Sequence, residues 1–242
     1  MNKRRKLIAA LGATALAAPV SAIAQQGSAR SAPASTEVLT VTKERTPMPD
    51  ITFDKSRTAL LIADFYAEQM SKLPHAVSRK CVDKTLALRQ AARKAGLFVR
   101  YSATVFRPGY VEVSERNKIF SERKRTGGPA IADPLKIIHP QMLPGDGEPV
   151  VGKHRVNAMF GTDLQMILGA RNIDTLFLLG YATSGVVLST SRYAADADYR
   201  LFVVEDCCAD NDAAVHDFLC AKIFPRQTEV VQSADVIKAL AG

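Results

Sequence analysis

Three short stretches of the sequence carry groups that could do acid–base chemistry. Asp64 follows a run of apolar residues, Lys153 closes another such run, and residues 180–190 (GYATSGVVLST) follow a third. An acid, a cation and the backbone N–H groups at the start of a helix are together typical of a site that transfers a proton and stabilises a developing oxyanion. Asp64 alone could equally cap the next helix, so only the combination indicates a reaction site.

These residues can act together only if the fold brings them to the same edge of a β-sheet. Six continuous apolar runs without in–out alternation are typical of parallel strands that are covered on both faces. The runs are residues 58–65, 97–104, 148–153, 173–180, 200–206 and 228–232. Segments of helical period separate them, so we predict a doubly wound α/β fold: a six-stranded, mostly parallel sheet with helices on both faces. In such sheets ligands bind beyond the carboxyl ends of the strands, where all three stretches fall.

Cap residues predict where two helices begin. Thr162 and Gln165 have the spacing of a capping box, which predicts a short helix through Leu168. Asp212 predicts the start of another helix, and Pro225 predicts its end.

A long insertion, residues 106–147, is rich in proline and glycine, and we predict that it forms a lid. Its basic run, residues 116–125, is either a solvated face or a surface that attracts an anionic substrate. The insertion follows the second strand on the predicted site edge, so its polar residues are either substrate contacts or solvated loop residues. The candidate contacts are Arg107, Tyr110, Arg116 and Asn117.

The amino-terminal residues predict export. Residues 1–24 combine a basic start, an apolar segment and a small-x-small cleavage site, which is typical of a signal peptide for the Sec or twin-arginine route. The apolar segment is too short to span a bilayer, so we expect no stable membrane insertion after cleavage and a periplasmic or secreted protein. Residues 25–50 are predicted to be a flexible tether, and residues 51–242 the folded domain.

Charge and ligand spacing exclude other classes of function. Half of the formal net charge of +8 lies in the first six residues, and no aromatic-interleaved basic stripe exists, which disfavours a nucleic-acid partner. The four histidines have no metal-ligand spacing, so we predict no metal and no cofactor. Cys81 and Cys220 lie on apolar helical stripes and are predicted core thiols, while the disulfide state of Cys207 and Cys208 is left open.

The sequence resembles the isochorismatase-like hydrolases, also called cysteine hydrolases, over nearly all of residues 58–241. The resemblance lies in LLIADFYAEQM, GKHRVNAMFGTDLQMIL and GARNIDTLFLLGYATSGVVLSTSRYAADADYRLFVVEDCCAD. It implies that Asp64 and Lys153 are the catalytic aspartate and lysine of the family. It also implies a cis peptide between Tyr181 and Ala182, near the oxyanion hole.

The nucleophilic cysteine of that family corresponds to Val186, which has no lone pair and cannot form a thioester. The resemblance includes a branch that lacks this thiol, the isochorismatases, which cleave a vinyl ether with the aspartate as general acid. Ser184, Cys207 and Cys208 are weaker substitutes, since structural roles explain each of them.

We therefore expect an exported hydrolase of a small molecule that uses Asp64 as acid or base and Lys153 as its electrostatic partner. The alternative is a catalytically silent protein of the same fold that binds a small ligand. The resemblance further implies a homo-oligomer, since relatives form dimers or tetramers.

Overall fold

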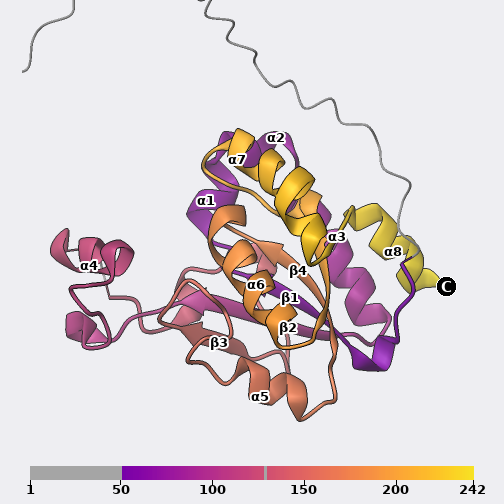
Figure 1. Ribbon diagram of the computed structural model, residues 1–242, viewed down its shortest axis with the longest axis horizontal. Helices are drawn as coiled ribbons and strands as arrows, with labels where there is room; N and C mark the ends of the chain where they lie inside the picture. Colours follow the sequence, from indigo (N-terminus) through magenta and orange to yellow (C-terminus); the bar gives the residue numbers. More distant parts are fainter. Residues whose placement is uncertain (1–50, 128–129) are drawn as a thin grey trace, which may run out of the picture. The chain divides into compact units, whose positions relative to one another are not determined.

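The computed structural model describes residues 51–127 and 130–242 (Figure 1). The predicted signal peptide, residues 1–24, and the predicted tether, residues 25–50, lie outside this part of the chain. Within the described part, no helix has the length and apolar character needed to cross a membrane.

Six strands form one sheet in the order β3-β2-β1-β4-β5-β6, and every pair is parallel. The strands are β1 (Thr58–Ala63), β2 (Phe98–Thr104), β3 (Val150–Lys153), β4 (Thr175–Gly180), β5 (Arg200–Val204) and β6 (Glu229–Val231). The predicted α/β fold and all six strands are confirmed. The order reverses between β1 and β4, so the carboxyl ends of these two strands flank the crevice where doubly wound sheets bind ligands.

Eight α-helices accompany the strands in the described part of the chain (Figure 1). They are α1 (Ala67–Lys72), α2 (Pro74–Ser78), α3 (Cys81–Lys94), α4 (Lys118–Arg125), α5 (Leu164–Gly169), α6 (Leu188–Asp196), α7 (Ala213–Phe218) and α8 (Ser233–Ala241). From the centre of the sheet, the crossover through α3 and the crossover through α6 step in opposite directions. Because such crossovers are right-handed, the two helices cover opposite faces.

The central strands form the middle of the core. Every residue of β1 and of β4 is buried, which explains why both segments are apolar throughout rather than alternating. Burying each large apolar side chain contributes roughly 1.5–3 kcal/mol. The four cysteines are also buried and are free thiols, which confirms Cys81 and Cys220 as core residues and shows Cys207 and Cys208 to be unbridged.

The cap predictions are partly correct. The Asp212 side chain accepts a hydrogen bond from the Ala214 N–H and caps α7 as predicted. Thr162 accepts from the Leu164 N–H near the start of α5, but Gln165 does not complete a capping box, because its side chain accepts from the Tyr193 hydroxyl instead. A contact with a distant helix therefore replaces the local one.

The long insertion has a small core of its own. Phe106, Tyr110, Val113 and Phe120 are buried together, and Val156 packs against them. This cluster fixes α4 beside the segment that follows β3. The described part of the insertion, residues 106–127 and 130–147, thus contains a packed cluster next to the segment that follows β3.

Candidate active site

Asp64 and Lys153 meet at the carboxyl edge of the sheet. Asp64 directly follows β1 and Lys153 ends β3, and both side chains are buried. Lys153 Nζ lies 2.6 Å from Asp64 Oδ2. The structure therefore brings together the two residues that the sequence singled out.

Thr104, at the end of the intervening strand β2, bridges the pair. Lys153 Nζ donates to Thr104 Oγ1 over 2.6 Å, and Thr104 Oγ1 donates to Asp64 Oδ2 over 3.3 Å. Lys153 Nζ also donates to the Arg155 carbonyl over 3.1 Å. Three neighbouring strand ends thus fix one carboxylate oxygen in a defined direction.

The other oxygen of Asp64, Oδ1, is buried and has no hydrogen-bond partner among the described residues. Leaving a buried acceptor unsatisfied costs about 1–3 kcal/mol. A bound substrate can satisfy it, either as a donor to the carboxylate or as an acceptor from the protonated carboxyl. The orphaned oxygen is therefore the point at which Asp64 can act on a ligand.

Burial controls the protonation of this pair. Burial raises the pKa of Asp64, although the charge of Lys153 and hydrogen bonds from its neighbours act to lower it. Burial likewise lowers the pKa of Lys153 against the opposing effect of Asp64. Burial thus acts against the charged form of each group, while the ion pair and its hydrogen bonds act in favour of the charged forms.

Tyr66 and Thr104 are site residues that the sequence analysis missed. The Tyr66 hydroxyl accepts a hydrogen bond from the Thr104 N–H over 2.9 Å. Burial, and then the charge of Asp64, raise the pKa of Tyr66 well above its usual value, so it stays a protonated phenol. Thr104 could have been found from its place at a strand end, whereas nothing in the sequence indicates where the Tyr66 ring lies.

The segment after β4 forms the second wall of the site. Gly180 has a φ of 140°, and the Tyr181 N–H donates to the Ala63 carbonyl over 3.1 Å, so the segment begins beside Asp64. The Tyr181–Ala182 peptide is cis, as the resemblance implied. The next five residues, Thr183–Val187, form one π-helical turn, called the site turn below.

The site turn offers fewer free backbone donors than expected. The Ser184 N–H donates to Asp210 Oδ2 over 2.7 Å, and the N–H groups of Thr183 and Gly185 donate to protein carbonyls. The Ala182 N–H, next to the isolated parallel β-bridge between Tyr181 and Ala209, is the candidate oxyanion donor at the start of the turn.

No described side chain replaces the missing cysteine. Val186 is buried in the site turn and offers no reactive atom. Burial raises the pKa of the Cys207 and Cys208 thiols, so neither is a ready thiolate. Ser184 is exposed and lies inside the turn instead of capping a helix, and its described contact is a backbone hydrogen bond to Asp210.

The four predicted substrate contacts have different surroundings. Tyr110 belongs to the small core, and Asn117 caps α4 by accepting from the Phe120 N–H over 3.1 Å. Arg107 is exposed, pairs with Glu112 at 3.6 Å and contacts His154, the neighbour of Lys153. Arg116 is exposed. None of the four has a described hydrogen bond or ion pair to Asp64 or Lys153.

A surface hollow of about 340 Å³ lies where α4, the segment after β3 and α6 meet. Its lining includes Asn117, Arg155, Val156, Phe160 and Tyr193. Because the Arg155 carbonyl accepts from Lys153 Nζ, one wall of the hollow is attached to the buried pair. The lining is mainly apolar with a few polar groups, as is usual where a small molecule binds.

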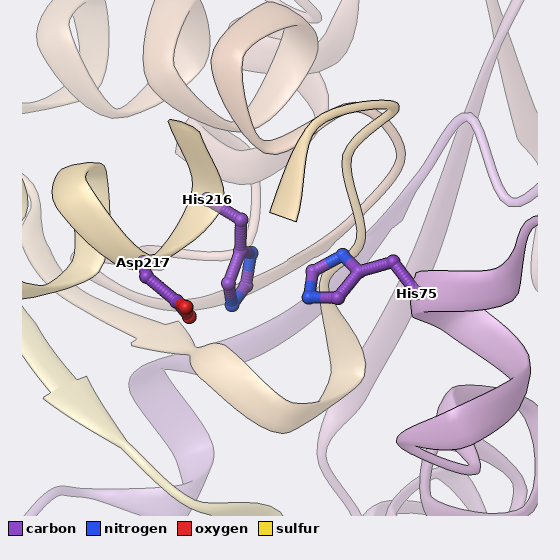
Figure 2. Close-up of side chains that lie close together, drawn as sticks. All are labelled: His75, His216 and Asp217. Atoms are coloured by element: carbon purple, nitrogen blue, oxygen red, sulfur yellow. The ribbon is translucent and has the colours of Figure 1, made fainter. Parts of the chain in front are cut away.

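A second polar cluster, which the sequence did not indicate, lies beside the site turn (Figure 2). Ligand atoms of His75, His216 and Asp217 approach within 4.8 Å of one another. The Asp210 N–H donates to His75 Nδ1, which leaves the remaining proton of the neutral ring on Nε2. Burial, and then the charge of Arg79, lower the pKa of both histidines, and Arg79 lies 4.0 Å from Asp217. The described contacts of these side chains form a hydrogen-bond network that includes the cation of Arg79.

Comparison with known proteins gives a family match over most of the chain. The model of the isochorismatase domain matches residues 58–235. The uncharacterised isochorismatase family protein YwoC of Bacillus subtilis is 30% identical over 181 residues, which are 74% of this chain and 92% of that protein. A shorter match is to the uncharacterised family protein YecD of Escherichia coli O157:H7, 34% identical over 42% of this chain, and it spans only 55% of that relative.

The fold also matches solved structures. An isochorismatase family protein from Burkholderia thailandensis superposes with a TM-score of 0.68 at 28% identity, covering 79% of this chain and 98% of that one. The fold of most of this chain is therefore the fold of that family member.

Proposed function

The chain belongs to the isochorismatase family of hydrolases, and we propose that it hydrolyses a small molecule with Asp64 as the general acid and Lys153 as its electrostatic partner. The observation that carries the proposal is the buried Asp64 carboxyl, held through Oδ2 by Lys153 and Thr104 while Oδ1 has no described partner. Burial raises the pKa of Asp64, which is the direction that a general acid needs.

The proposed hydrolysis returns Asp64 to its protonated state. On an amide, Asp64 gives its proton to the leaving nitrogen and water adds its oxygen to the carbonyl carbon. On a vinyl ether, Asp64 protonates the terminal vinyl carbon, water adds to the oxygen-bearing carbon, and the hemiketal collapses to an alcohol and a ketone. The second proton of that water returns to Asp64. Lys153 stabilises the transient carboxylate, and the Ala182 N–H stabilises negative charge that develops on the substrate. No step requires a nucleophile at Val186.

Two bond types fit this chemistry, an amide and a vinyl ether. Relatives carry names of both kinds: a maleamate amidohydrolase of Pseudomonas putida, of which the chain covers 51%, and a probable isochorismatase of Pseudomonas chlororaphis, of which it covers 86%. The exposed Arg107, which contacts His154 next to Lys153, favours an anionic substrate. We therefore propose small carboxylate-bearing amides and vinyl ethers as the panel to screen.

The test compares the protein with Asp64→Asn on that panel. Removing the general acid lowers kcat by about 10²–10⁴-fold. Asp174→Asn is the matched control, because that carboxylate pairs with Arg57 on the surface, at the amino end of β4. Treatment with iodoacetamide leaves turnover unchanged. Inactivation by the alkylating reagent, or full activity in Asp64→Asn, contradicts the mechanism.

The second candidate function is a small-ligand-binding protein without turnover. Val186 favours it, because this side chain occupies the nucleophile position and cannot react. In that case a panel member binds, for example by calorimetry, and its affinity survives Asp64→Asn while no product forms with either protein.

We further propose that residues 1–24 direct export and are removed, which places the protein in the periplasm or outside the cell. The charge pattern and the small-x-small site of residues 22–24 support this. Sequencing the amino terminus of protein recovered from the periplasm or medium is expected to begin at Gln25. An intact Met1 on all of the protein would contradict it.

A further inference from the structure

The site turn, Thr183–Val187, is held from outside by the segment after β5 and by α7. We propose that His216 is a positioning residue, which acts through the Thr183 hydroxyl to fix this turn beside Asp64. The inference rests on the proposed function, because the turn and the Ala182 N–H form one wall of that site.

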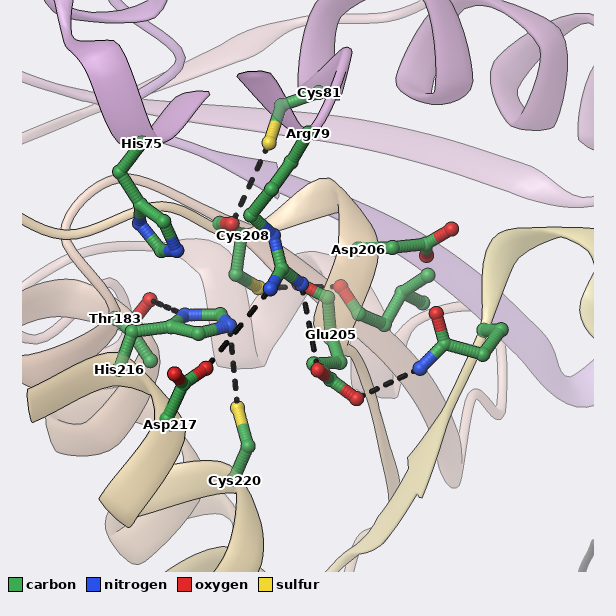
Figure 3. A network of polar contacts seen from close by, with 12 residues as sticks. His75, Arg79, Cys81, Thr183, Glu205, Asp206, Cys208, His216, Asp217 and Cys220 are labelled. Carbon is green, nitrogen blue, oxygen red and sulfur yellow. Dashed lines mark hydrogen bonds and ion pairs between the residues drawn. The ribbon is translucent and has the colours of Figure 1, made fainter. Parts of the chain in front are cut away.

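Three hydrogen bonds join the turn to this outer support, and Figure 3 draws the one between Thr183 and His216. Thr183 Oγ1 lies 2.8 Å from His216 Nδ1, and the Thr183 N–H donates to the Ala209 carbonyl over 2.9 Å. The Ser184 N–H donates to Asp210 Oδ2 over 2.7 Å. Only the contact with His216 uses a side chain of the turn, so it can be removed without altering the backbone.

His216 is itself held firmly. It is completely buried, its ring contacts the His75 ring edge-on at 4.7 Å between centroids, and its Nε2 lies 3.7 Å from Cys220 Sγ. Burial, with the charges of Arg79 and His75, lowers the pKa of His216 to about 4. The ring is therefore neutral, with Nδ1 engaged by Thr183 and Nε2 facing Cys220.

Asp210 links the same support to His75. Its N–H donates to His75 Nδ1 over 3.3 Å while its side chain holds the Ser184 N–H. Arg79 pairs with Glu205 at 3.4 Å, which closes the polar cluster on its far side (Figure 3). These contacts hold the polar cluster together, and the turn packs against it.

The turn needs such support for a local reason. Its interior residue Gly185 has φ −97° and ψ −105°, which is not helical, and no side chain caps its start. A π-helical turn is rare and is stable only where the surroundings favour it. Since a misplacement of about 1 Å at a reaction site can lower the rate about 10²-fold, the position of this turn bears directly on activity.

Two substitutions of His216 separate positioning from packing. The amide of Asn can occupy the place of Nδ1, and the amide of Gln can occupy the place of Nε2. We expect His216→Asn to keep the contact with Thr183 and retain kcat within about threefold. We expect His216→Gln to lose that contact and to lower kcat about 10–100-fold with little change in KM.

The partner residue gives the complementary test. Thr183→Val removes the hydroxyl at nearly constant shape and should lower kcat as much as His216→Gln, whereas Thr183→Ser should restore it. If the two residues act through one contact, the Thr183→Val/His216→Gln double variant is no slower than either single variant. Val236→Ala, a buried core change in α8, controls for lost stability and should leave kcat unchanged.

A spectroscopic measurement keeps this test independent of turnover. The methyl resonances of Val186 report the position of the turn, and we expect them to shift in Thr183→Val and His216→Gln but not in Val236→Ala. If kcat and these resonances respond no more than in Val236→Ala, or if His216→Gln matches His216→Asn, the proposal is overturned. If the unaltered protein turns over no substrate, the proposed function fails, while the Val186 resonances still decide the role of His216.

Discussion

At the scale of single residues, the chemistry of this protein depends on which protonation states burial allows. Asp64 and Lys153 touch at 2.6 Å, yet burial moves the pKa of the acid up and that of the amine down. A surface pair of the same residues would remain fully charged. Burial at the sheet edge therefore shifts the pKa of Asp64 in the direction that the proposed general-acid role requires.

The pH profile tests the role of Asp64. If its protonated form is the active one, kcat/KM is highest at acidic pH and falls as pH rises through the raised pKa of Asp64, by about tenfold per unit. A general base would give the opposite sign, with activity that falls as pH drops. The measurement is kcat/KM on the best panel substrate between pH 4 and pH 9, and a rise with pH contradicts the general-acid assignment.

His216 should make stability depend on pH. Its pKa is about 4 in the folded protein and near 6.5 when exposed, so the unfolded state binds the extra proton first. The stability that depends on a neutral His216 is present in full above about pH 6.5. It is lost as pH falls towards 4, and the free energy of unfolding then falls by at most about 1.4 kcal/mol per pH unit.

The check is urea unfolding at several pH values with His216→Asn as the comparison. The difference in unfolding free energy between the two proteins should shrink as pH falls from 6.5 to 4, because the variant lacks the titrating ring. His75 titrates in both proteins and cancels in this difference. A difference that stays constant over that range would show that His216 is not held neutral.

At the scale of elements, the site exists because strands end next to one another. β3, β2 and β1 deliver Lys153, Thr104 and Asp64 to the same edge, and β4 delivers the turn. The closest approach is at Gly180, where a Cβ would lie 1.8 Å from the Ala63 carbonyl oxygen and where φ is 140°. Only glycine fits there, so this position fixes the junction between Asp64 and the turn.

We therefore expect Gly180→Ala to be severely destabilised, by more than about 4 kcal/mol, or to fail to fold. Gly169→Ala at the end of α5 is the matched control, since no atom lies within 4 Å of its added Cβ. That variant should be stabilised by about 0.4–1 kcal/mol through the unfolded chain. Urea unfolding compares the two, and similar midpoints would contradict the close approach.

At the scale of the whole molecule, assembly stays a prediction. Ile119 and Phe160, which line the hollow beside the site, are 64% and 57% exposed. Apolar side chains exposed together often mark a contact surface. A homo-oligomer that covers them would also shield the site from water.

Light scattering after size exclusion should give a mass that is a multiple of one processed chain. Phe160→Ser should lower the mass or raise the concentration at which the assembly dissociates. Phe218→Ser is the control, because Phe218 is similarly exposed, at 54%, on α7. A monomer at all concentrations, or equal effects of the two substitutions, would exclude the hollow as the contact surface.

The sheet, its six strands and the proximity of Asp64 to Lys153 could be predicted from the sequence alone. Strands buried on both faces must be apolar throughout, and parallel strands present their carboxyl ends together, so composition and order carry this information. That Val186 stands where the family has its nucleophilic cysteine is what the resemblance implied, and it stays a prediction.

The contacts and pKa shifts of the site residues, by contrast, depend on the three-dimensional fold. Thr104 and Tyr66 belong to the site because of contacts between residues that are distant in the sequence. The Gln165 side chain accepts a hydrogen bond from Tyr193 instead of completing the expected cap. The rings of His75 and His216, which are far apart in the sequence, are in contact next to the site turn. Such contacts and the pKa shifts that follow depend on burial and direction in space, which residue type and spacing along the chain do not specify.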